Sequence, residues 1–336
     1  MMDYSTILEK NRIKTDKNYD CSKFINQINI NLLKLKEPLI LSLSGGVDSM
    51  VLLFIIKEIL HKNVIAIHIN YKNRDESDLE ADFLINFCNK IDVKIEIMEL
   101  NIKRRDSKRK NYEIYSTKKR YSFYYEILEK YFVDYIILGH HKDDIVENIF
   151  NNFIKGISLF NLGSMKLTGT RNNINIIRPL IDFHKIEVYS IANNYFIPYF
   201  NDTTPDWSQR GIFRNETMKC LEKSYNNPKQ NLLSVSEQLT EWSDVIESLI
   251  VNPILESVNY SIEEHGIDVE FCFEKLNNHV LWMEILKRIY HKYSLNCPSN
   301  KSVKNLINNL HDGTVCLTKD SIATIKNNYI IIKIII

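Results

Sequence analysis

The sequence has no two cysteines spaced as C-x-x-C, and no apolar run reaches the roughly 18 residues of a membrane span. Scattered cysteines without that spacing argue against a zinc ribbon, an iron–sulfur cluster and a disulfide scaffold. We therefore expect buried free thiols in a reducing compartment, at Cys21, Cys88, Cys220, Cys272, Cys297 and Cys316. No secretory signal follows Met1, so the expected location is the cytoplasm, away from any membrane.

The net charge is also low: 43 Lys and Arg residues nearly balance 42 Asp and Glu residues, which leaves a formal charge of +1. A nucleic-acid surface must therefore be a local basic patch rather than a property of the whole chain. The hydrophobic fraction of 44% and the charged fraction of 25% are typical of a globular protein. The length of 336 residues suits two domains.

Two common nucleotide-binding motifs, G-x-x-x-x-G-K-[ST] and G-x-G-x-x-G, are absent. Residues 38–50 read PLILSLSGGVDSM instead, so a buried strand turns through S-G-G-V-D-S into an apolar helix. Glycines let the backbone approach an anion, and a helix N-terminus offers unpaired N–H groups and a positive dipole end. The turn therefore predicts a cup for a pyrophosphate group, in which Asp48 orients the loop or holds Mg²⁺. Its residues are Ser44, Gly45, Gly46, Val47, Asp48 and Ser49.

From residue 38 to about residue 200, strand-like and helix-like stretches alternate. The expected strands are 38–43, 64–69, 93–99 and 134–138, and the expected helices are 48–61, 77–91, 112–131, 142–155 and 183–195. Nearly continuous β-branched strands that alternate with helices indicate a parallel sheet covered on both faces. The spacing of Phe24, Ile28 and Leu32 predicts a further helix packed against this domain.

Beyond about residue 215 the pattern changes to long helical stretches. The expected helices are 216–224, 230–250, 274–293 and 300–310, and residues 314–335 have the pattern of short strands. The predicted fold class is therefore α/β: a Rossmann-like parallel-sheet domain followed by a mainly helical domain with a small β end. The predicted limits are 1–36 for an N-terminal extension, 37–215 for the nucleotide-binding domain and 216–336 for the helical domain.

A second polar cluster, G-H-H-K-D-D-I-V-E-N at residues 139–148, follows the strand expected at 134–138. Asp144 and Glu147 are three residues apart, so they share one face of the helix that starts there. That face lies at the carboxyl edge of the sheet, where open α/β folds bind ligands. Two carboxylates there can hold an ammonium group or accept the proton of an attacking amine. His140 is expected to line the nucleotide pocket, because no further ligand at a recognised spacing supports a zinc site.

A basic run, K-R-R-D-S-K-R-K at 103–110, precedes the helix expected at 112–131. Basic residues with nearby tyrosines can contact RNA through phosphate pairing and base stacking, whereas many charge runs are only solvated mobile loops. The candidate RNA-binding residues are Arg104, Arg105, Arg109, Lys110, Lys118, Lys119 and Arg120.

The S-G-G-V-D-S turn resembles the PP-loop of the N-type ATP pyrophosphatases. Several stretches of the sequence are similar to motifs of one family of that superfamily, the tRNA(Ile)-lysidine synthases, and they occur in the same order along the chain. They are A-I-H-I-N at 66–70, R-Y at 120–121, H-H-K-D-D-I-V-E at 140–147, R-P-L at 178–180 and R-N at 214–215. Tyr71 replaces a second histidine of the family pattern, and Thr117 replaces an arginine. The resemblance covers roughly residues 38 to 330.

The resemblance implies a ligase that adenylates the C2 oxygen of the wobble cytidine in a tRNA(Ile) with a CAU anticodon. The ε-amine of L-lysine then displaces AMP. The implied cofactors are therefore ATP and Mg²⁺, and the implied partners are this tRNA and L-lysine. The oligomeric state stays open, a homodimer included. The chain is expected to lack the second C-terminal RNA-binding domain of longer members.

The resemblance also implies roles for particular residues. Residues 44–49 would hold the phosphates, and His68 would border the adenine pocket. Asp144 and Glu147 would hold and deprotonate lysine, and Arg214 would stabilise developing negative charge.

Alternative functions stay open. A PP-loop tRNA thiolase or another adenylating tRNA-modifying enzyme would share the ATP chemistry, but thiolases commonly use cysteine pairs that this sequence lacks. An amidotransferase-linked synthetase needs a cysteine after the initiator, where this chain has Met2. A non-catalytic RNA-binding descendant is disfavoured by the intact phosphate loop and carboxylate pair.

Overall fold

The computed structural model describes residues 4–10, 12–16, 18–72, 75–100, 109–159, 162, 165–202, 204, 208–263, 266–273, 276, 278–311 and 313–335. Contacts divide the chain into two compact units, Met1–Glu237 and Gln238–Ile336. The division falls inside the long helix α9 (Pro228–Ile246).

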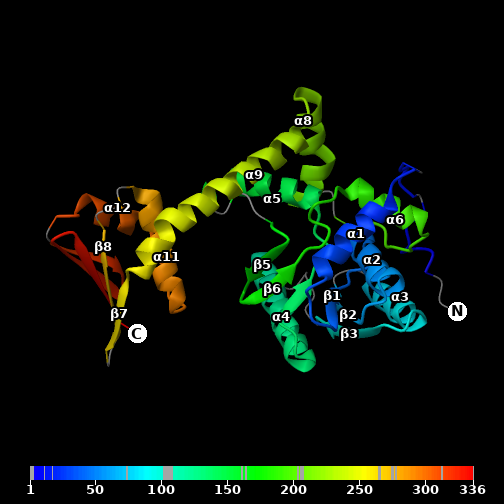
Figure 1. Cartoon of the computed structure of the whole chain (residues 1–336), viewed down its shortest axis with the longest axis horizontal. Coiled ribbons are helices and arrows are strands. Elements are labelled where there is room, and N and C mark those ends of the chain that lie inside the picture. Colours follow the sequence, from blue (N-terminus) through cyan, green and yellow to red (C-terminus); the bar gives the residue numbers. More distant parts are fainter. Residues whose placement is uncertain are drawn as a thin grey trace. The chain divides into compact units, whose positions relative to one another are not determined.

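The first unit is built on a six-stranded sheet with the order β3-β2-β1-β4-β6-β5 (Figure 1). Its strands are β1 (Leu39–Ser42), β2 (Val64–Asn70), β3 (Lys94–Glu99), β4 (Tyr135–Ile137), β5 (Thr168–Arg171) and β6 (Ile174–Ile177). Neighbours pair in parallel except for β5, which forms an antiparallel hairpin with β6 at one edge. The chain runs outward from β1 through β2 and β3 and then returns to the other side of β1 as β4, so the strand order reverses between β1 and β4.

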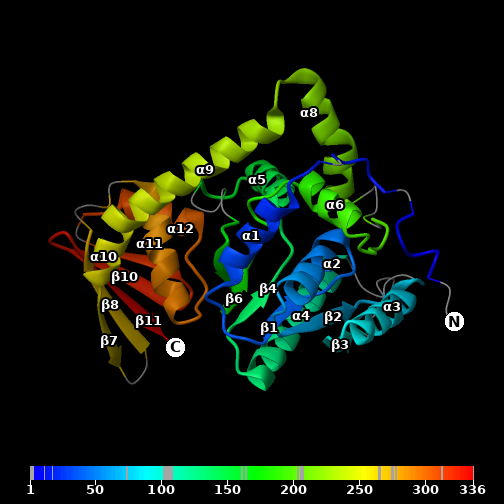
Figure 2. The same cartoon turned by 45° about the vertical axis from the view of Figure 1, so that its right-hand side comes forward.

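Helices cover both faces of this sheet, as the sequence predicted (Figure 2). Leu39 and Leu41 of β1 face the larger core, which α1, α2, α3 and α6 complete, whereas Ile40 faces α4 on the other side. Because neighbouring side chains of a strand point to opposite faces, a strand buried on both faces is apolar at every position. These helices are α1 (Cys21–Leu32), α2 (Val47–Phe54), α3 (Ser77–Lys90), α4 (Arg109–Tyr131) and α6 (Lys185–Asn194).

The last part of the first unit is helical. It contains α7 (Gln209–Ile212), α8 (Met218–Ser224) and the start of α9, and it packs against the earlier helix α5 (Lys142–Ile154). Val146 of α5 packs with Phe213, Met218 and Leu233 in a small separate apolar cluster. This cluster holds α8 and the first turns of α9 against α5, and it explains why the compact unit ends at Glu237. The domain limits inferred from the sequence stay a prediction.

The second unit contains an antiparallel sheet with the order β7-β8-β11-β10-β9 (Figure 2). Its strands are β7 (Asn259–Glu263), β8 (Gly266–Cys272), β9 (Gly313–Thr318), β10 (Ser321–Lys326) and β11 (Tyr329–Ile335), and its helices include α10 (Asn252–Glu256), α11 (His279–Lys292) and α12 (Asn300–Asn308). Trp282 of α11 is fully buried against Phe271 and Phe273. Its indole N–H donates to the carbonyl of Leu276 at 3.0 Å, so this large side chain has a polar partner inside the core.

The predicted α/β class and parallel sheet are confirmed, and the differences lie in single elements. Sequence reasoning missed β5, β6, β7 and β8 and placed the start of α11 too early, since residues 276 and 278 are not helical. It also missed the π-helical turns that extend several helices. These are η1 (Ile55–Ile59) after α2, η4 (Phe213–Thr217) before α8 and η5 (Glu247–Val251) after α9.

The six cysteines are free, but they are not all buried. Only Cys88 is buried in the core, Cys21, Cys272 and Cys297 are partly buried, and Cys220 and Cys316 are exposed. The expectation of buried thiols is therefore confirmed for Cys88 and wrong for the two exposed cysteines. Among the residues that the structure describes, no helix is both long and apolar enough to cross a membrane.

Replacing Phe24 by alanine is expected to lower the free energy of unfolding by about 3–5 kcal/mol, the usual cost of emptying a buried aromatic site. Phe24 is fully buried in the face of α1 that meets the sheet, and its ring centroid lies 4.1 Å from that of Phe183. Ile30 of the same helix is 64% exposed, so Ile30→Ala should change that free energy by less than about 0.5 kcal/mol. Denaturant unfolding of both variants checks this, and equal losses would contradict the assigned core face.

Candidate nucleotide and amine site

The predicted phosphate loop, residues 44–49, joins the end of β1 to the start of α2. Ser49 donates its hydroxyl to the carbonyl of Gly46 at 3.0 Å, and the backbone N–H of Ser44 donates to Ser49 Oγ at 3.2 Å. Helix α2 begins at Val47, and no described side chain caps its first turn. Unpaired N–H groups and the positive end of the helix dipole are the features that favour a bound phosphate.

Gly45 has to be glycine for two physical reasons. Its φ of +81° lies in the left-handed region that side chains disfavour. A Cβ atom on it would lie 1.9 Å from Cε2 of Phe200, which packs directly on the loop. The backbone N–H of Phe200 also donates to the carbonyl of Gly45 at 2.9 Å, so residue 200 holds the loop from outside.

The cluster at 139–148 meets the phosphate loop because β1 and β4 are adjacent parallel strands. Leu41 pairs with Ile137, and the chain then turns at Gly139 into α5. A Cβ atom on Gly139 would lie 3.0 Å from Cβ of Asp48, so the two turns are in close contact. Open α/β sheets bind ligands where the strand order reverses, and the two turns flank that position.

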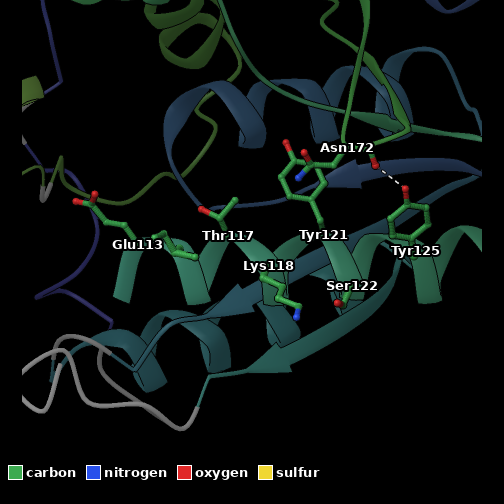
Figure 3. Close-up of a pocket in the computed structure, with 8 residues that line it drawn as sticks. Glu113, Thr117, Lys118, Tyr121, Ser122, Tyr125 and Asn172 are labelled. Atoms are coloured by element: carbon green, nitrogen blue, oxygen red, sulfur yellow. Dashed lines mark hydrogen bonds between the residues drawn. The ribbon is translucent and has the colours of Figure 1, made fainter. Parts of the chain in front are cut away.

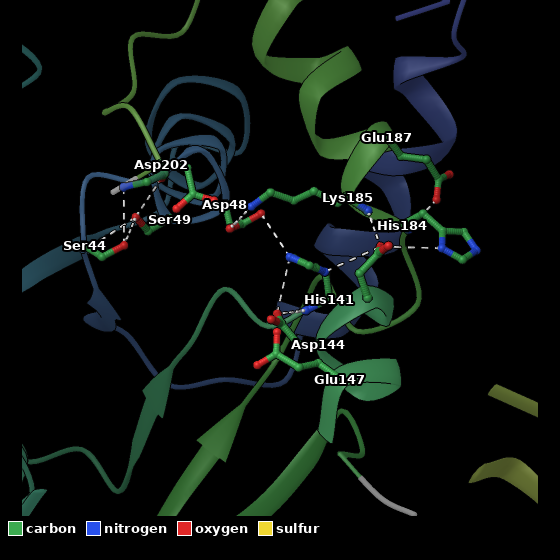
Figure 4. A network of polar contacts seen from close by, with 12 residues as sticks. Ser44, Asp48, Ser49, His141, Asp144, Glu147, His184, Lys185, Glu187 and Asp202 are labelled. Atoms are coloured by element: carbon green, nitrogen blue, oxygen red, sulfur yellow. Dashed lines mark hydrogen bonds and ion pairs between the residues drawn. The ribbon is translucent and has the colours of Figure 1, made fainter. Parts of the chain in front are cut away.

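Asp48 connects the phosphate loop with the second cluster (Figure 4). One of its carboxylate oxygens accepts a hydrogen bond from Lys185 of α6 at 2.5 Å. The other is buried, lies 3.7 Å from Nε2 of His141 and has no hydrogen-bond partner among the described residues. The same nitrogen of His141 is 3.4 Å from Oδ2 of Asp144, so the imidazole stands between the two aspartates.

Asp144 and Glu147 lie on one face of α5, as their spacing predicted, and both are buried. The two oxygens of Glu147 accept hydrogen bonds from Nε of Arg210 and Nε of Arg214, the second at 3.1 Å. Nη2 of each arginine also lies 3.5 Å from Oδ1 of Asp144. Guanidinium groups therefore neutralise both carboxylates, while a third carboxylate, Asp202, lies 3.7 Å from Nη1 of Arg214.

The surroundings of Asp144 keep its carboxyl group ionised. Burial alone would raise its pKa, but His141, His140 and Arg210, together with a backbone hydrogen bond, outweigh burial and lower the pKa. That bond is donated by the backbone N–H of His141 to Oδ2 at 3.1 Å. A carboxylate of lowered pKa binds a cation well and accepts a proton poorly, so Asp144 is suited to holding an ammonium group.

Two predicted nucleotide contacts, His68 and His140, lie next to the ends of β1 and β4. Burial lowers the pKa of His140 to about 4, so its imidazole is neutral near pH 7. Burial also lowers the pKa of His68, whose Nδ1 lies 2.8 Å from the carbonyl of Leu43, immediately before the loop. Neutral rings at these positions are compatible with an uncharged base such as adenine, and the contact itself stays a prediction.

The predicted RNA-binding residues are only partly placed by the structure. Arg104 and Arg105 lie outside the described residues. Arg109 and Lys110 belong to α4, but their side chains are not described. Lys118 and Lys119 are exposed on α4, and Nζ of Lys119 lies 5.8 Å from the ring centroid of Tyr115. Arg120 is half-buried instead, and its Nε donates to the hydroxyl of Tyr71 at 2.8 Å. The tyrosine that departs from the family pattern is thus the partner of this arginine.

A pocket of about 650 Å³ opens between α4 and the β5–β6 turn (Figure 3). The hydroxyl of Tyr125 donates to the carbonyl of Asn172 at 2.5 Å and so links the helix to the hairpin. The pocket combines aromatic rings with the positive charge of Lys118. Its lining residues are Glu113, Ile114, Thr117, Lys118, Tyr121, Ser122, Tyr125 and Asn172.

Four residues of the polar network were not among the predicted site residues: His141, Lys185, Asp202 and Arg210. Arg210 did carry a signal, because it precedes Arg214 by four residues and the two therefore share one helical face. Lys185 carried none, because its approach to Asp48 depends on how α6 packs against α2 in the folded unit.

Mg²⁺ was predicted to bind Asp48. Within the described part of the chain, no group of three or more His, Cys, Asp or Glu residues could hold a metal ion. Asp48 offers one buried oxygen without a hydrogen-bond partner, while Lys185 engages the other. Mg²⁺ in nucleotide sites is commonly held by one or two carboxylates, substrate phosphates and water. Asp48 therefore suits Mg²⁺ when the phosphates of a bound nucleotide and water supply the other ligands.

The fold and this first βα turn are those of a PP-loop protein, and the comparison with known families agrees. Residues 14–221 match the PP-loop domain family, so the chain belongs to that family. A solved structure of the U34-tRNA thiolase NcsA from Methanococcus maripaludis is similar in fold. It has a TM-score of 0.51 and 21% identity, over 66% of this chain and 78% of that chain. At that identity the likeness supports the fold alone.

Curated relatives named tRNA(Ile)-lysidine synthase confirm the resemblance seen in the sequence. The protein of Staphylococcus aureus (strain MRSA252) is 25% identical over 273 residues, which are 80% of this chain and 63% of the relative. The protein of Francisella philomiragia subsp. philomiragia is 29% identical over 233 residues, which are 69% of this chain and 56% of the relative. The chain thus spans about six-tenths of the length of the curated relatives it matches.

The lowered pKa of His140 predicts a pH dependence of stability. As pH falls from 6.5 to about 4, an unfolded histidine takes up a proton that folded His140 does not, so stability decreases over this window and no further below it. The loss is up to roughly 3 kcal/mol, at 1.36 kcal/mol per unit of pKa difference. His140→Asn should flatten the decrease. Denaturant unfolding of both proteins between pH 7 and about pH 4 measures this, and identical slopes would contradict it.

Proposed function

We propose that this protein is a tRNA-modifying ligase. ATP adenylates the C2 oxygen of the wobble cytidine in a tRNA(Ile) with a CAU anticodon, and L-lysine then replaces AMP. The observation that carries this proposal is the position of His141 between two aspartates. Its Nε2 lies 3.7 Å from Oδ1 of Asp48 and 3.4 Å from Oδ2 of Asp144. It joins a phosphate loop to a carboxylate pair suited to an ammonium group. The names of the curated relatives support the same reaction.

The phosphate side of the site consists of the loop 44–49 and its neighbours. The first-turn N–H groups of α2 and the hydroxyls of Ser44 and Ser49 would donate to phosphate oxygens. Lys185 pairs with Asp48, so an incoming polyanion does not face an unneutralised carboxylate. Asp48 would hold Mg²⁺, which supplies positive charge to the departing pyrophosphate.

The amine side of the site consists of Asp144 and Glu147, and here two arginines have to give way. A lysine ammonium would replace the guanidinium groups of Arg210 and Arg214 on the carboxylates. Guanidinium groups bind phosphate as well as carboxylate, so ATP or RNA offers them a new partner. Until then the arginines stabilise two buried charges that would be costly to leave unpaired.

The proposed reaction balances without a further reactant. The C2 oxygen of cytidine forms a bond to the α-phosphorus of ATP, and pyrophosphate leaves. The ε-ammonium group of lysine first gives one proton to a carboxylate of the site. The neutral amine then forms a bond to C2 while the C2–O bond breaks with release of AMP, and the proton that the amine loses on bonding passes to water. Glu147 is the proposed acceptor of the first of these protons, because the lowered pKa of Asp144 suits Asp144 to holding the cation.

The test uses purified protein, Mg·ATP, labelled L-lysine and a tRNA(Ile) transcript with a CAU anticodon. Label is expected at the wobble cytidine, where nucleoside mass spectrometry locates it. Asp144→Asn and Glu147→Gln should each lower kcat/KM for lysine by about 100-fold or more, because each removes one buried charge that would pair with the ammonium group. Glu129→Gln, at an exposed position of α4, is the matched control and should retain full activity.

Other outcomes would redirect the proposal. Adenylated RNA without lysine uptake would keep the ATP step and reject lysine as the nucleophile. Protein that binds the tRNA but uses no ATP would contradict the ligase and favour a non-catalytic RNA-binding role.

A further inference from the structure

An N-terminal segment outside the family match is part of the packed fold. The PP-loop match begins at residue 14, and residues 4–10 and 12–13, here called the N-terminal strap, precede it. Ile7 of the strap is 3% exposed and belongs to the larger core of the first unit. The strap is therefore held in place by apolar burial and has a defined path over the first unit.

The strap pairs with the segment that carries Phe200. Leu8 and Phe200 form an antiparallel bridge, and two backbone hydrogen bonds of 3.0 and 2.9 Å join the strap to residues 199–201. The N–H donors are Glu9 and Asn201, and the carbonyl acceptors are Tyr199 and Ile7.

Phe200 is held on its other side by the phosphate loop. Its backbone N–H donates to the carbonyl of Gly45 at 2.9 Å, and its ring lies over Gly45 where any side chain would clash. In an extended chain the N–H and C=O groups of successive residues point to opposite sides. Tyr199 and Asn201 therefore bond to the strap on one side while Phe200 bonds to the loop on the other, as in the middle strand of a sheet. Phe83 adds ring contacts with Phe200 and Tyr4, at centroid distances of 5.5 and 5.2 Å.

Arg12 anchors the end of the strap. Its Nη1 donates to the carbonyl of Ala192 at 2.7 Å and its Nη2 to the carbonyl of Ile197 at 3.1 Å. Ala192 lies in the last turn of α6, where carbonyl groups have no partner within the helix. The same helix carries Lys185, which pairs with Asp48 of the phosphate loop. The strap thus supports two of the elements that surround the loop.

We propose that the N-terminal strap positions the phosphate loop for ATP. It fixes residues 199–201, and Phe200 in turn fixes Gly45, so that the first turn of α2 presents its N–H groups to the phosphates. This inference rests on ATP binding in the proposed function. A loop that adopts the binding conformation only a tenth of the time binds its ligand about tenfold more weakly.

The test compares Ile7→Ala and Arg12→Met with the unaltered full chain. The dissociation constant of ATP, measured by equilibrium dialysis well below the melting temperature, should rise about tenfold in each variant. The dissociation constant of the tRNA, measured by filter binding, should stay within about twofold, because the strap bonds to residues 199–201 and α6 whereas Lys118, Lys119 and Arg120 lie on α4. Arg12→Lys retains a cation and should recover part of the ATP affinity.

The matched control is Ile127→Ala, which empties an equally buried site under α4 on the opposite face of the sheet. It should lower thermal stability without changing ATP affinity. ATP affinity that is unchanged in both strap variants, or that falls as much in Ile127→Ala, would overturn the inference. Unaltered protein that binds no ATP would overturn the proposed function together with it, so the two failures are distinguishable.

Discussion

The parallel pairing of β1 with β4 is the constraint on which this site depends. It places the carboxyl ends of two strands side by side, and after each strand the chain leaves the sheet through a turn that contains glycine. Gly45 is required because Phe200 occupies the space of a side chain, and a side chain on Gly139 would crowd Asp48. Without this adjacency, a phosphate loop and a carboxylate pair that are distant in sequence would not share a site.

Charge pairing makes this site stable without a ligand. Four carboxylates face three basic side chains: Asp48, Asp144, Glu147 and Asp202 against Lys185, Arg210 and Arg214. Buried charges persist only when they are paired, so an entering ligand exchanges partners instead of filling an empty position. In the proposed reaction a polyanion would draw the cations toward itself and free the carboxylates for an ammonium group. Phosphate binding would then favour amine binding, which is thermodynamic coupling through one charge network.

Local sequence predicted the parts of the site that depend on neighbours in the chain. The glycine turn between strand and helix follows from S-G-G-V-D-S, and the shared face of Asp144 and Glu147 follows from helical spacing. The basic partners of these residues come from α6, α7 and η4, whose positions depend on tertiary packing, so Lys185 escaped prediction. The edge strand β5 escaped prediction because T-G-T-R has no apolar residue, whereas β7 carries Tyr260 and Ile262 two residues apart and so had a weak strand pattern. By contrast, β8 carries Ile267, Val269 and Phe271 with a period of two, so this strand could have been predicted although it was missed.

In the proposed reaction the phosphate loop and the carboxylate pair act as one site, in which ATP is cleaved between its α and β phosphates for an RNA acceptor. The most direct measurement is the product formed from ATP labelled at the α-phosphate, with the tRNA and L-lysine present. AMP is expected in an amount equal to the lysine incorporated, and none is expected when the tRNA is omitted. Labelled ADP, or AMP formed at the same rate without the tRNA, would contradict the proposed reaction.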